Sequence, residues 1–307
     1  IRSNSNFTDY DFEGSNLSTI IDVLAYNTYI TSYNANMVSN EVFIDSATLR
    51  ENVVSLASNI GYTPYSKKAS QANISFFVDT SNYADVPQTI TLNKGIVASS
   101  NSFANESYTF AILDDITVPV SNNEAVFDNV AIYEGVYLTS TFTVNSFDPN
   151  QRFILDNSGI DLSTVRVVVK PSESSTVTRK YTQADSLFEV NGESAVYFVQ
   201  EVEGERYELI FGDGIFGKKL EAPSFIEVSY LVTGGELANG INDFNFSGKL
   251  TSSRDNISIT TGVSLLTSIN SSSLGRSIQS IDSIKKYSTR IYSSQKRAVT
   301  TADFEAL

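Results

Sequence analysis

The spacing of apolar residues changes twice along this chain of 307 residues. Residues 15–61 carry apolar side chains three and four positions apart, the spacing of one face of a helix. From about Ala72 to Thr261 the pattern is instead that of short strands separated by Gly and Asn. Helical spacing returns after Ile278. This order predicts an α+β fold, in which a β-rich middle of two packed units lies between helical ends.

The N-terminal segment has the spacing of amphipathic helices. Ser15 or Asn16 can cap a first helix, because both side chains accept hydrogen bonds from the free amides of a helix start. The apolar pattern weakens at residues 33–36, which predicts a break there, and a second helical stretch is expected over Met37–Ile44. Such stripes normally face a core. The alternative is a helical bundle shared with other subunits, since so short a block has little of its own to pack on.

A third helix is expected in the next twenty residues. Asp45 or Ser46 is the candidate N-cap, and the apolar residues that follow again recur at helical spacing. Gly61 is expected to end this helix, because glycine readily adopts the left-handed conformation that closes a helix, and Pro64 follows shortly after it.

The middle of the chain contains several predicted strands. Val136–Val144 alternates apolar and mostly polar residues, which predicts a half-buried strand. Thr164–Lys170 is rich in β-branched residues and is expected to be buried on both faces. Ala195–Val202 and Arg206–Phe211 flank the turn-forming residues Glu203–Glu205, so these two strands are expected to pair as a hairpin.

The changes of pattern predict four segments. Residues 1–66 form an N-terminal helical segment, and residues 67–148 form a first β-rich unit. Residues 149–262 form a second β-rich unit, and residues 263–307 form a linker with the start of a C-terminal helical domain. A capping-box-like start at Thr300–Asp303 opens a helix that the sequence does not complete, so we expect the polypeptide to continue.

Composition removes several kinds of chemistry. The chain contains neither Cys nor His, which excludes disulfides, thiolate and Ser-His-Asp catalysis, and the usual zinc sites. A net charge of −14 argues against general affinity for nucleic acid. A pair of carboxylates could still act as a glycosidase, but the glutamates between Asp185 and Asp213 have the spacing of a hairpin's solvent face and turn. We therefore predict no catalytic, cofactor-binding or metal-binding residues and no enzymatic activity.

A glycine-rich stretch, Phe211–Leu220, has the spacing of a phosphate-binding loop. Such a loop requires a helix after it, because the helix N-terminus supplies the amides that hold phosphate. Here Pro223 and a further predicted strand follow instead. We interpret the stretch as a structural turn between two strands, with its key residues at Gly212, Asp213, Gly214 and Gly217.

The C-terminal part carries a basic segment in an otherwise acidic chain. From Arg276 to Arg297 there are six basic residues and one acidic residue, Asp282. One interpretation is a solvated helix face, and the other is a docking surface for an acidic neighbour, such as another copy of this chain. The candidate docking residues are Lys285, Lys286, Arg290, Lys296 and Arg297.

Several segments resemble the baseplate J-like wedge proteins of contractile-tailed phages, especially the T-even-type gene-six members of that family. The most specific is Asn36–Ala57, which runs on to Gly61–Pro64, and Val23–Asn27 precedes it. Phe211–Gly217 is similar to the family's turn between strands, and Lys296–Glu305 to the segment that opens its C-terminal part. The matching segments occur in the family's order along almost the whole chain.

The match is uneven. Between Tyr83 and Asn191 the chain shares only general strand character with the family. Glu221–Pro223 stands where many relatives carry a Pro-Gly pair.

The resemblance implies a structural role in the virion, in the tail baseplate, after assembly in the host cytoplasm. It implies a homodimer that contacts neighbouring wedges in a sixfold ring, joins other wedge proteins through helical bundles, and supports the sheath and tube. It implies no cofactor, no direct contact with nucleic acid and no insertion into a membrane. The alternatives are a wedge protein of another contractile injection system, a carbohydrate-binding or carbohydrate-cleaving tail protein, and a nucleotide-binding module.

Overall fold

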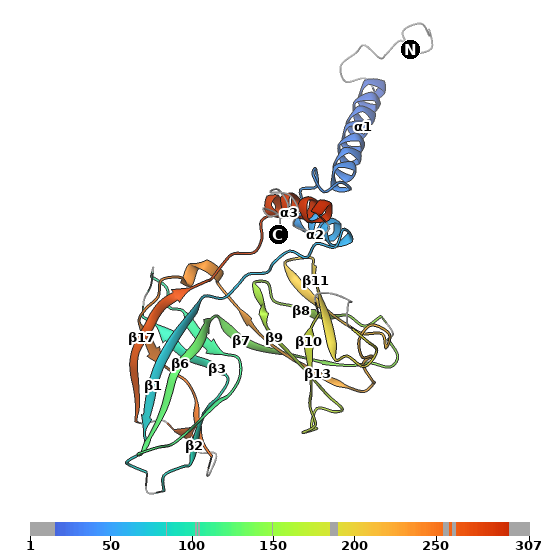
Figure 1. Ribbon diagram of the computed structural model, residues 1–307. Helices are drawn as coiled ribbons and strands as arrows, with labels where there is room; N and C mark the ends of the chain where they lie inside the picture. Colours follow the sequence, from blue (N-terminus) through green and yellow to red (C-terminus); the bar gives the residue numbers. More distant parts are fainter. Residues whose placement is uncertain are drawn as a thin grey trace, which may run out of the picture. The chain divides into compact units, whose positions relative to one another are not determined.

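The computed structural model describes residues 16–83, 85–101, 103, 105–148, 150–184, 190–253, 258–259 and 262–294. Its contacts divide the chain into two compact units. The helical unit combines Ile1–Pro64 with Ser280–Leu307, and the β body is Tyr65–Gln279. Helices thus precede and follow a β-rich middle, which confirms the predicted α+β fold (Figure 1).

The first helix of the helical unit is longer than predicted. Helix α1 runs without interruption over Asn16–Glu41, so the break expected at residues 33–36 and the separate helix over Met37–Ile44 are wrong. The stretch at 33–36 lacks Gly and Pro, and asparagines alone cost a helix only a few tenths of a kcal/mol each. A weakened apolar pattern was therefore no evidence of a helix end.

Helix α2, Arg50–Asn59, starts later than predicted. Its N-cap residue is Leu49, whose side chain makes no capping bond, so the caps expected at Asp45 or Ser46 are wrong. The Ser46 hydroxyl instead donates to the carbonyl of Asn40, 2.6 Å away. The predicted stop at Gly61 is confirmed: its φ is +81°, and the next amide, that of Tyr62, donates to the carbonyl of Ala57 over 3.0 Å.

The helical unit has a small core of its own. Helix α3, Ile281–Ser294, packs on α2, and the buried members of this core are Ala47, Val53, Val54, Ala57 and Ile284. All but one of these residues come from the N-terminal side of the chain. The core therefore closes only when α3 contributes Ile284 to it.

In the first part of the β body, two sheets enclose one core. The strand orders are β14-β3-β4-β6-β1-β17 and β16-β15-β2-β5. The long strands β6, β1 and β17 lie side by side (Figure 1). The strands of the six-stranded sheet are β1 (Gln71–Asp79), β3 (Gly95–Ser100), β4 (Thr109–Ile112), β6 (Glu124–Glu134), β14 (Phe244–Phe246) and β17 (Val263–Ser273). Those of the four-stranded sheet are β2 (Thr89–Leu92), β5 (Ile116–Pro119), β15 (Leu250–Ser252) and β16 (Ser258–Ile259).

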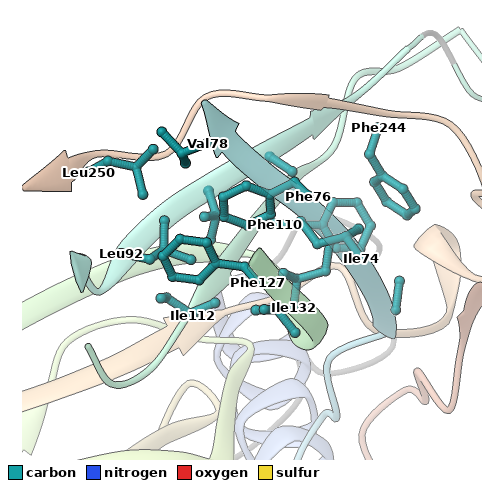
Figure 2. Close-up of a cluster of buried hydrophobic side chains, with 14 of the residues drawn as sticks. Ile74, Phe76, Val78, Leu92, Phe110, Ile112, Phe127, Ile132, Phe244 and Leu250 are labelled. Carbon is teal, nitrogen blue, oxygen red and sulfur yellow. The ribbon is translucent and has the colours of Figure 1, made fainter. Parts of the chain in front are cut away.

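Aromatic side chains fill the middle of this core. Phe76 of β1 stacks on Phe127 of β6, with ring centroids 4.6 Å apart, and Phe110 packs edge-to-face on Phe244 (Figure 2). Phe76, Phe110 and Phe127 are completely buried. The alternation of buried and partly buried residues in β1 and β6 follows from the period of two in a strand.

The second part of the β body is a seven-stranded sheet, in the order β7-β13-β9-β10-β11-β12-β8. The strand predicted over Val136–Val144 is confirmed as β7, and the predicted hairpin is confirmed as β11 paired with β12. The expectation that Thr164–Lys170 is buried on both faces is wrong, because the residues of β9 alternate and Arg166 is exposed. The strands are β7 (Val136–Thr143), β8 (Phe153–Leu155), β9 (Ile160–Lys170), β10 (Arg179–Gln183), β11 (Val196–Val202), β12 (Arg206–Phe211) and β13 (Phe225–Val232).

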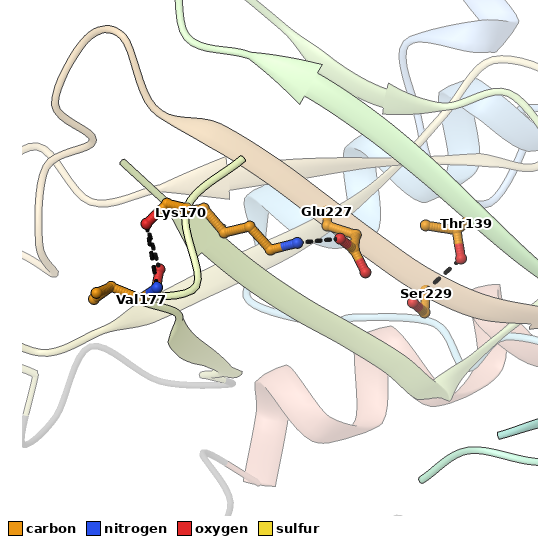
Figure 3. A network of polar contacts seen from close by, with 6 residues as sticks. Thr139, Lys170, Val177, Glu227 and Ser229 are labelled. Atoms are coloured by element: carbon orange, nitrogen blue, oxygen red, sulfur yellow. Dashed lines mark hydrogen bonds and ion pairs between the residues drawn. The ribbon is translucent and has the colours of Figure 1, made fainter. Parts of the chain in front are cut away.

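Polar contacts also join neighbouring strands of this sheet. Lys170 of β9 forms an ion pair of 2.7 Å with Glu227 of β13, and on the other side of β13 the hydroxyls of Thr139 and Ser229 lie 3.4 Å apart (Figure 3). Both pairs lie across adjacent strands, where facing side chains are close enough to interact.

Two buried carboxylates connect the two parts of the β body. Asp161, at the start of β9, accepts a hydrogen bond of 2.8 Å from the amide of Ala69, just before β1. Glu134, at the end of β6, accepts from the hydroxyl of Thr233 and the amide of Gly234, which follow β13. Burial raises the pKa of Glu134, and these two donors act in the opposite direction.

Candidate assembly surfaces

Helix α1 carries many apolar side chains but buries none of its residues within the described chain. They lie on all sides of the helix, in a segment of 26 residues. A helix that is apolar all round is normally enclosed by protein. The large exposed apolar side chains of α1 are Ile20, Ile21, Val23, Leu24, Tyr26, Tyr29, Tyr33, Met37 and Val38.

The end of α1 is tied to the start of α2 by one carboxylate. Glu41 accepts hydrogen bonds from the amide and hydroxyl of Thr48, the amide of Leu49 and the side-chain amide of Asn52, at 2.6–3.3 Å. The bonds from Asn52 and Thr48 are the main cause that lowers the pKa of Glu41 to about 2. The carboxylate supplies the acceptor that Leu49, as N-cap, lacks.

The predicted basic docking residues fall into two groups. Lys285, Lys286 and Arg290 lie on α3, whereas Lys296 and Arg297 lie outside the described residues. The Lys285 ammonium donates to the carbonyl of Asp45 over 3.0 Å. Lys286 is exposed, with its ammonium 5.7 Å from the centroid of the Tyr287 ring. Lys286 is therefore the cation of this group that is most accessible to a neighbour.

The glycine-rich stretch adopts a closed turn with no helix after it. The Gly214 amide donates to the Gly217 carbonyl over 3.0 Å, and a Cβ on Gly212 would lie 2.1 Å from the Gly217 carbonyl carbon. Asp213 accepts bonds of 2.8 and 2.9 Å from the amides of Ile215 and Phe216. These amide bonds lower the pKa of the Asp213 carboxyl, with the Phe216 amide the larger cause.

Of the acidic residues between Asp185 and Asp213, Asp185 and Glu189 lie outside the described residues, and two of the others are paired with basic side chains. Glu208 is paired with Arg152, Glu193 with Lys218, and Glu203 lies at the tip of the β11–β12 hairpin. Among the described residues, no group of three or more acidic side chains is placed to hold a metal ion. None of the described helices is both long and apolar enough to span a membrane.

Sequence reasoning missed one surface. Ile215 and Phe216 lie at the tip of the glycine turn and are exposed, and a pocket lies beside the turn. The sequence signal for this surface is a pair of adjacent apolar residues between two glycines that have positive φ.

The chain is similar to known phage proteins. Residues 1–62 match the family described as baseplate wedge protein gp6-like, helical domain. The chain is also 28% identical, over 269 residues, to the baseplate wedge protein gp6 of Enterobacteria phage T4. That match covers 82% of this chain but only 39% of the phage T4 protein, so the chain spans about two fifths of its relative's length. The resemblance expected from the sequence motifs is confirmed, and this chain is similar to the gp6-like baseplate wedge proteins.

Proposed function

We propose that this chain is a structural subunit of a phage tail baseplate wedge, located in the virion, with no enzymatic activity. The subunit contributes to the platform that joins wedges and supports assembly of the sheath and tube. The similarity to the phage T4 wedge protein supports the class of protein. The architecture supports the role, because the β body is folded around its own cores while the helical unit presents a long apolar helix.

The observation that carries this proposal is the exposure of α1. None of the described residues 16–41 is buried. A helix in a protein owes most of its stability to the packing of an apolar face against neighbouring segments. Helix α1 therefore requires cover, and we assign that cover to other wedge subunits in a helical bundle, a second copy of this chain among them.

The proposal is tested by substitutions on α1 that leave the β body untouched. Tyr26→Ser with Tyr29→Ser should abolish incorporation of the subunit into baseplates, while the far-ultraviolet spectrum keeps its strand signal. The control is Val177→Ser in the β body, because Val177 is 69% exposed and Tyr29 is 67% exposed. Incorporation is scored by electron microscopy of particles assembled from a tail extract that lacks the native subunit. Normal particles from the double variant would contradict the proposal.

The basic part of α3 is a second proposed contact. Lys286→Glu should weaken wedge assembly by making α3 less positive towards an acidic neighbour, and the loss should be greatest at low salt. The three-residue reversal of Lys285, Lys286 and Arg290 to Glu should weaken it further. Lys249→Glu serves as a control of equal charge change in the β body. If the sedimentation profile of the assembled wedge were the same for the parent chain, Lys286→Glu and the three-residue reversal, this contact would be removed from the proposal.

A further inference from the structure

The chain contains two Asn–Gly pairs, at Asn191–Gly192 and at Asn239–Gly240. In such a pair the main-chain nitrogen of the glycine can attack the side-chain amide carbon of the asparagine, because glycine has no Cβ to obstruct the approach. The attack requires a glycine amide and an asparagine side chain that are not held by hydrogen bonds, since those bonds must otherwise break first. The two pairs differ in this respect.

The pair at Asn239 is held at both reacting groups. The Oδ1 atom of Asn239 accepts from the Ser70 hydroxyl over 2.6 Å and from the Gly275 amide over 3.0 Å. Its Nδ2 atom donates to the Gly275 carbonyl over 3.0 Å. The Gly240 amide, which would be the attacking group, donates to the Ser272 carbonyl over 2.8 Å. Asn239 is also half-buried, so neither the asparagine side chain nor the glycine amide is free to react.

The pair at Asn191 is open. Asn191 is exposed, and neither its Nδ2 atom nor the Gly192 amide makes a hydrogen bond to a residue that the structure describes. Its Oδ1 atom accepts from the Glu193 amide and from the Ser194 hydroxyl, each over 3.0 Å. These two donors favour attack on the side-chain amide, because they stabilise the negative charge that develops on Oδ1 as the new bond forms.

We propose that Asn191 is a site of spontaneous deamidation, which loosens the glycine turn, and that Asn239 is protected from the same reaction. The Gly192 nitrogen bonds to Cγ of Asn191, its proton passes to the departing side-chain nitrogen, and ammonia leaves as the Cγ–Nδ2 bond breaks. Water then opens the cyclic imide. Cleavage of the bond from Cγ to the Gly192 nitrogen gives aspartate, and cleavage of the bond from the main-chain carbonyl carbon gives isoaspartate. No group is oxidised or reduced.

The modified residue lies where a second loop supports the glycine turn. The Gly217 amide donates to the Asn191 carbonyl over 3.1 Å. Gly192 packs closely on the turn, because a Cβ at Gly192 would lie 2.2 Å from the Gly214 carbonyl oxygen. Isoaspartate lengthens the main chain by one methylene group at this close approach, and both products add a negative charge. The bond from Gly217 should therefore weaken when Asn191 is modified.

Mass spectrometry of the aged chain tests the site. The whole chain is incubated in mildly alkaline buffer, which favours loss of the proton from the attacking amide, and is then digested. Aspartate and isoaspartate should accumulate at residue 191, and residue 239 should react at least about tenfold more slowly, because its hydrogen bonds must open first. The control is the same chain unfolded in urea, in which the two residues should react at similar rates. Equal rates in the folded chain, or no reaction at residue 191, would overturn the proposal.

Hydrogen exchange of the Gly217 amide tests the effect on the turn. Exchange should become faster after incubation, in proportion to the modified fraction, because the amide loses its acceptor. The matched control is Asn191→Gln, whose longer side chain closes the imide ring far more slowly, so its exchange rate should stay constant over the same incubation. Unchanged exchange in chains that carry isoaspartate at residue 191 would overturn the proposed loosening of the turn.

Discussion

Helix α1 and strand β1 are both rich in apolar residues but bury them to opposite extents. Strand β1 hides Ile74, Phe76 and Val78 completely, whereas no residue of α1 is buried in the described chain. The strand finds neighbours on both sides within its own chain, in β6 and β17. The difference separates two uses of apolar surface: in β1 it stabilises the subunit itself, and in α1 it stays exposed and is the surface that we propose other subunits cover.

The largest expected effect is in the core around β1. Phe76→Ala should lower the free energy of unfolding by about 3–5 kcal/mol, because it removes a stacked ring from a fully packed core and leaves a cavity. Urea unfolding followed by tyrosine fluorescence measures the change. Phe147→Ala is the matched control, since Phe147 is 93% exposed. If Phe76→Ala and Phe147→Ala lowered the free energy of unfolding by similar amounts, burial of apolar side chains would not be what distinguishes β1 from α1.

A buried polar contact should matter almost as much. Asp161 is 2% exposed and accepts from the Ala69 amide and from the amide and hydroxyl of Ser163. Asp161→Ala leaves these donors without their acceptor and should cost about 3 kcal/mol in the same urea assay. Asp161→Asn keeps one acceptor oxygen and should cost less. If both variants had the same free energy of unfolding as the parent chain, the stability of the β body would depend on its apolar cores alone.

The glycine turn should show a smaller effect. Gly212→Ala introduces a Cβ that would lie 2.1 Å from backbone of Gly217, so the turn must open. We expect a loss of about 1–3 kcal/mol, typical of steric overpacking. Gly61→Ala is an informative second variant, because its Cβ meets nothing within 4 Å and only its φ of +81° opposes the change. A Gly212→Ala chain as stable as the parent would show that the turn tolerates opening.

The exposed helix should contribute little to the stability of the isolated subunit. Tyr29→Ser in α1 should change the free energy of unfolding by less than about 0.5 kcal/mol, because the side chain is mostly in solvent. The same variant should reduce incorporation into baseplates. If Tyr29→Ser instead caused a large loss of stability and no loss of assembly, the apolar surface of α1 would serve the stability of the subunit, as that of β1 does.

The smallest effect is on the response to acid. The pKa of Glu41 is lowered to about 2 from 4.5, so its contribution to folding is present above about pH 4.5 and is lost as the pH falls through 2. The amide of Thr48 should report this in a nuclear magnetic resonance titration with a midpoint near 2. Glu41→Gln should abolish the transition. A midpoint near 4.5 would show that the four hydrogen bonds do not hold the carboxylate in solution.

Local signals in the sequence were sufficient for the hairpin, for β7 and for the stop at Gly61. Each depends on residues close in the chain: alternation, a turn between two strands, or a glycine with positive φ. The start of α2 was missed for a related reason. Its acceptor, Glu41, lies seven positions before Thr48 on the previous helix, outside the window in which a capping motif is sought.

Strand partners could not be predicted, because alternation shows which face is buried but not what pairs with the edge. Strands β14 and β17, late in the chain, pair with β3 and β1, early in the chain. The four-segment division and the docking roles remain predictions. The pair Ile215 and Phe216 shows the same limit at the candidate site, since exposure depends on the fold around a residue.

The core of the helical unit combines residues that precede the β body in the sequence with Ile284, which follows it. This order has a consequence for biosynthesis. Helix α2 leaves the ribosome early, but Ile284 emerges only after more than two hundred further residues have been translated. The β body can thus fold while α2 still waits for α3. Because domains generally fold as units during synthesis, a partner that recognises the packed α2–α3 pair would bind only after the whole β body has been translated.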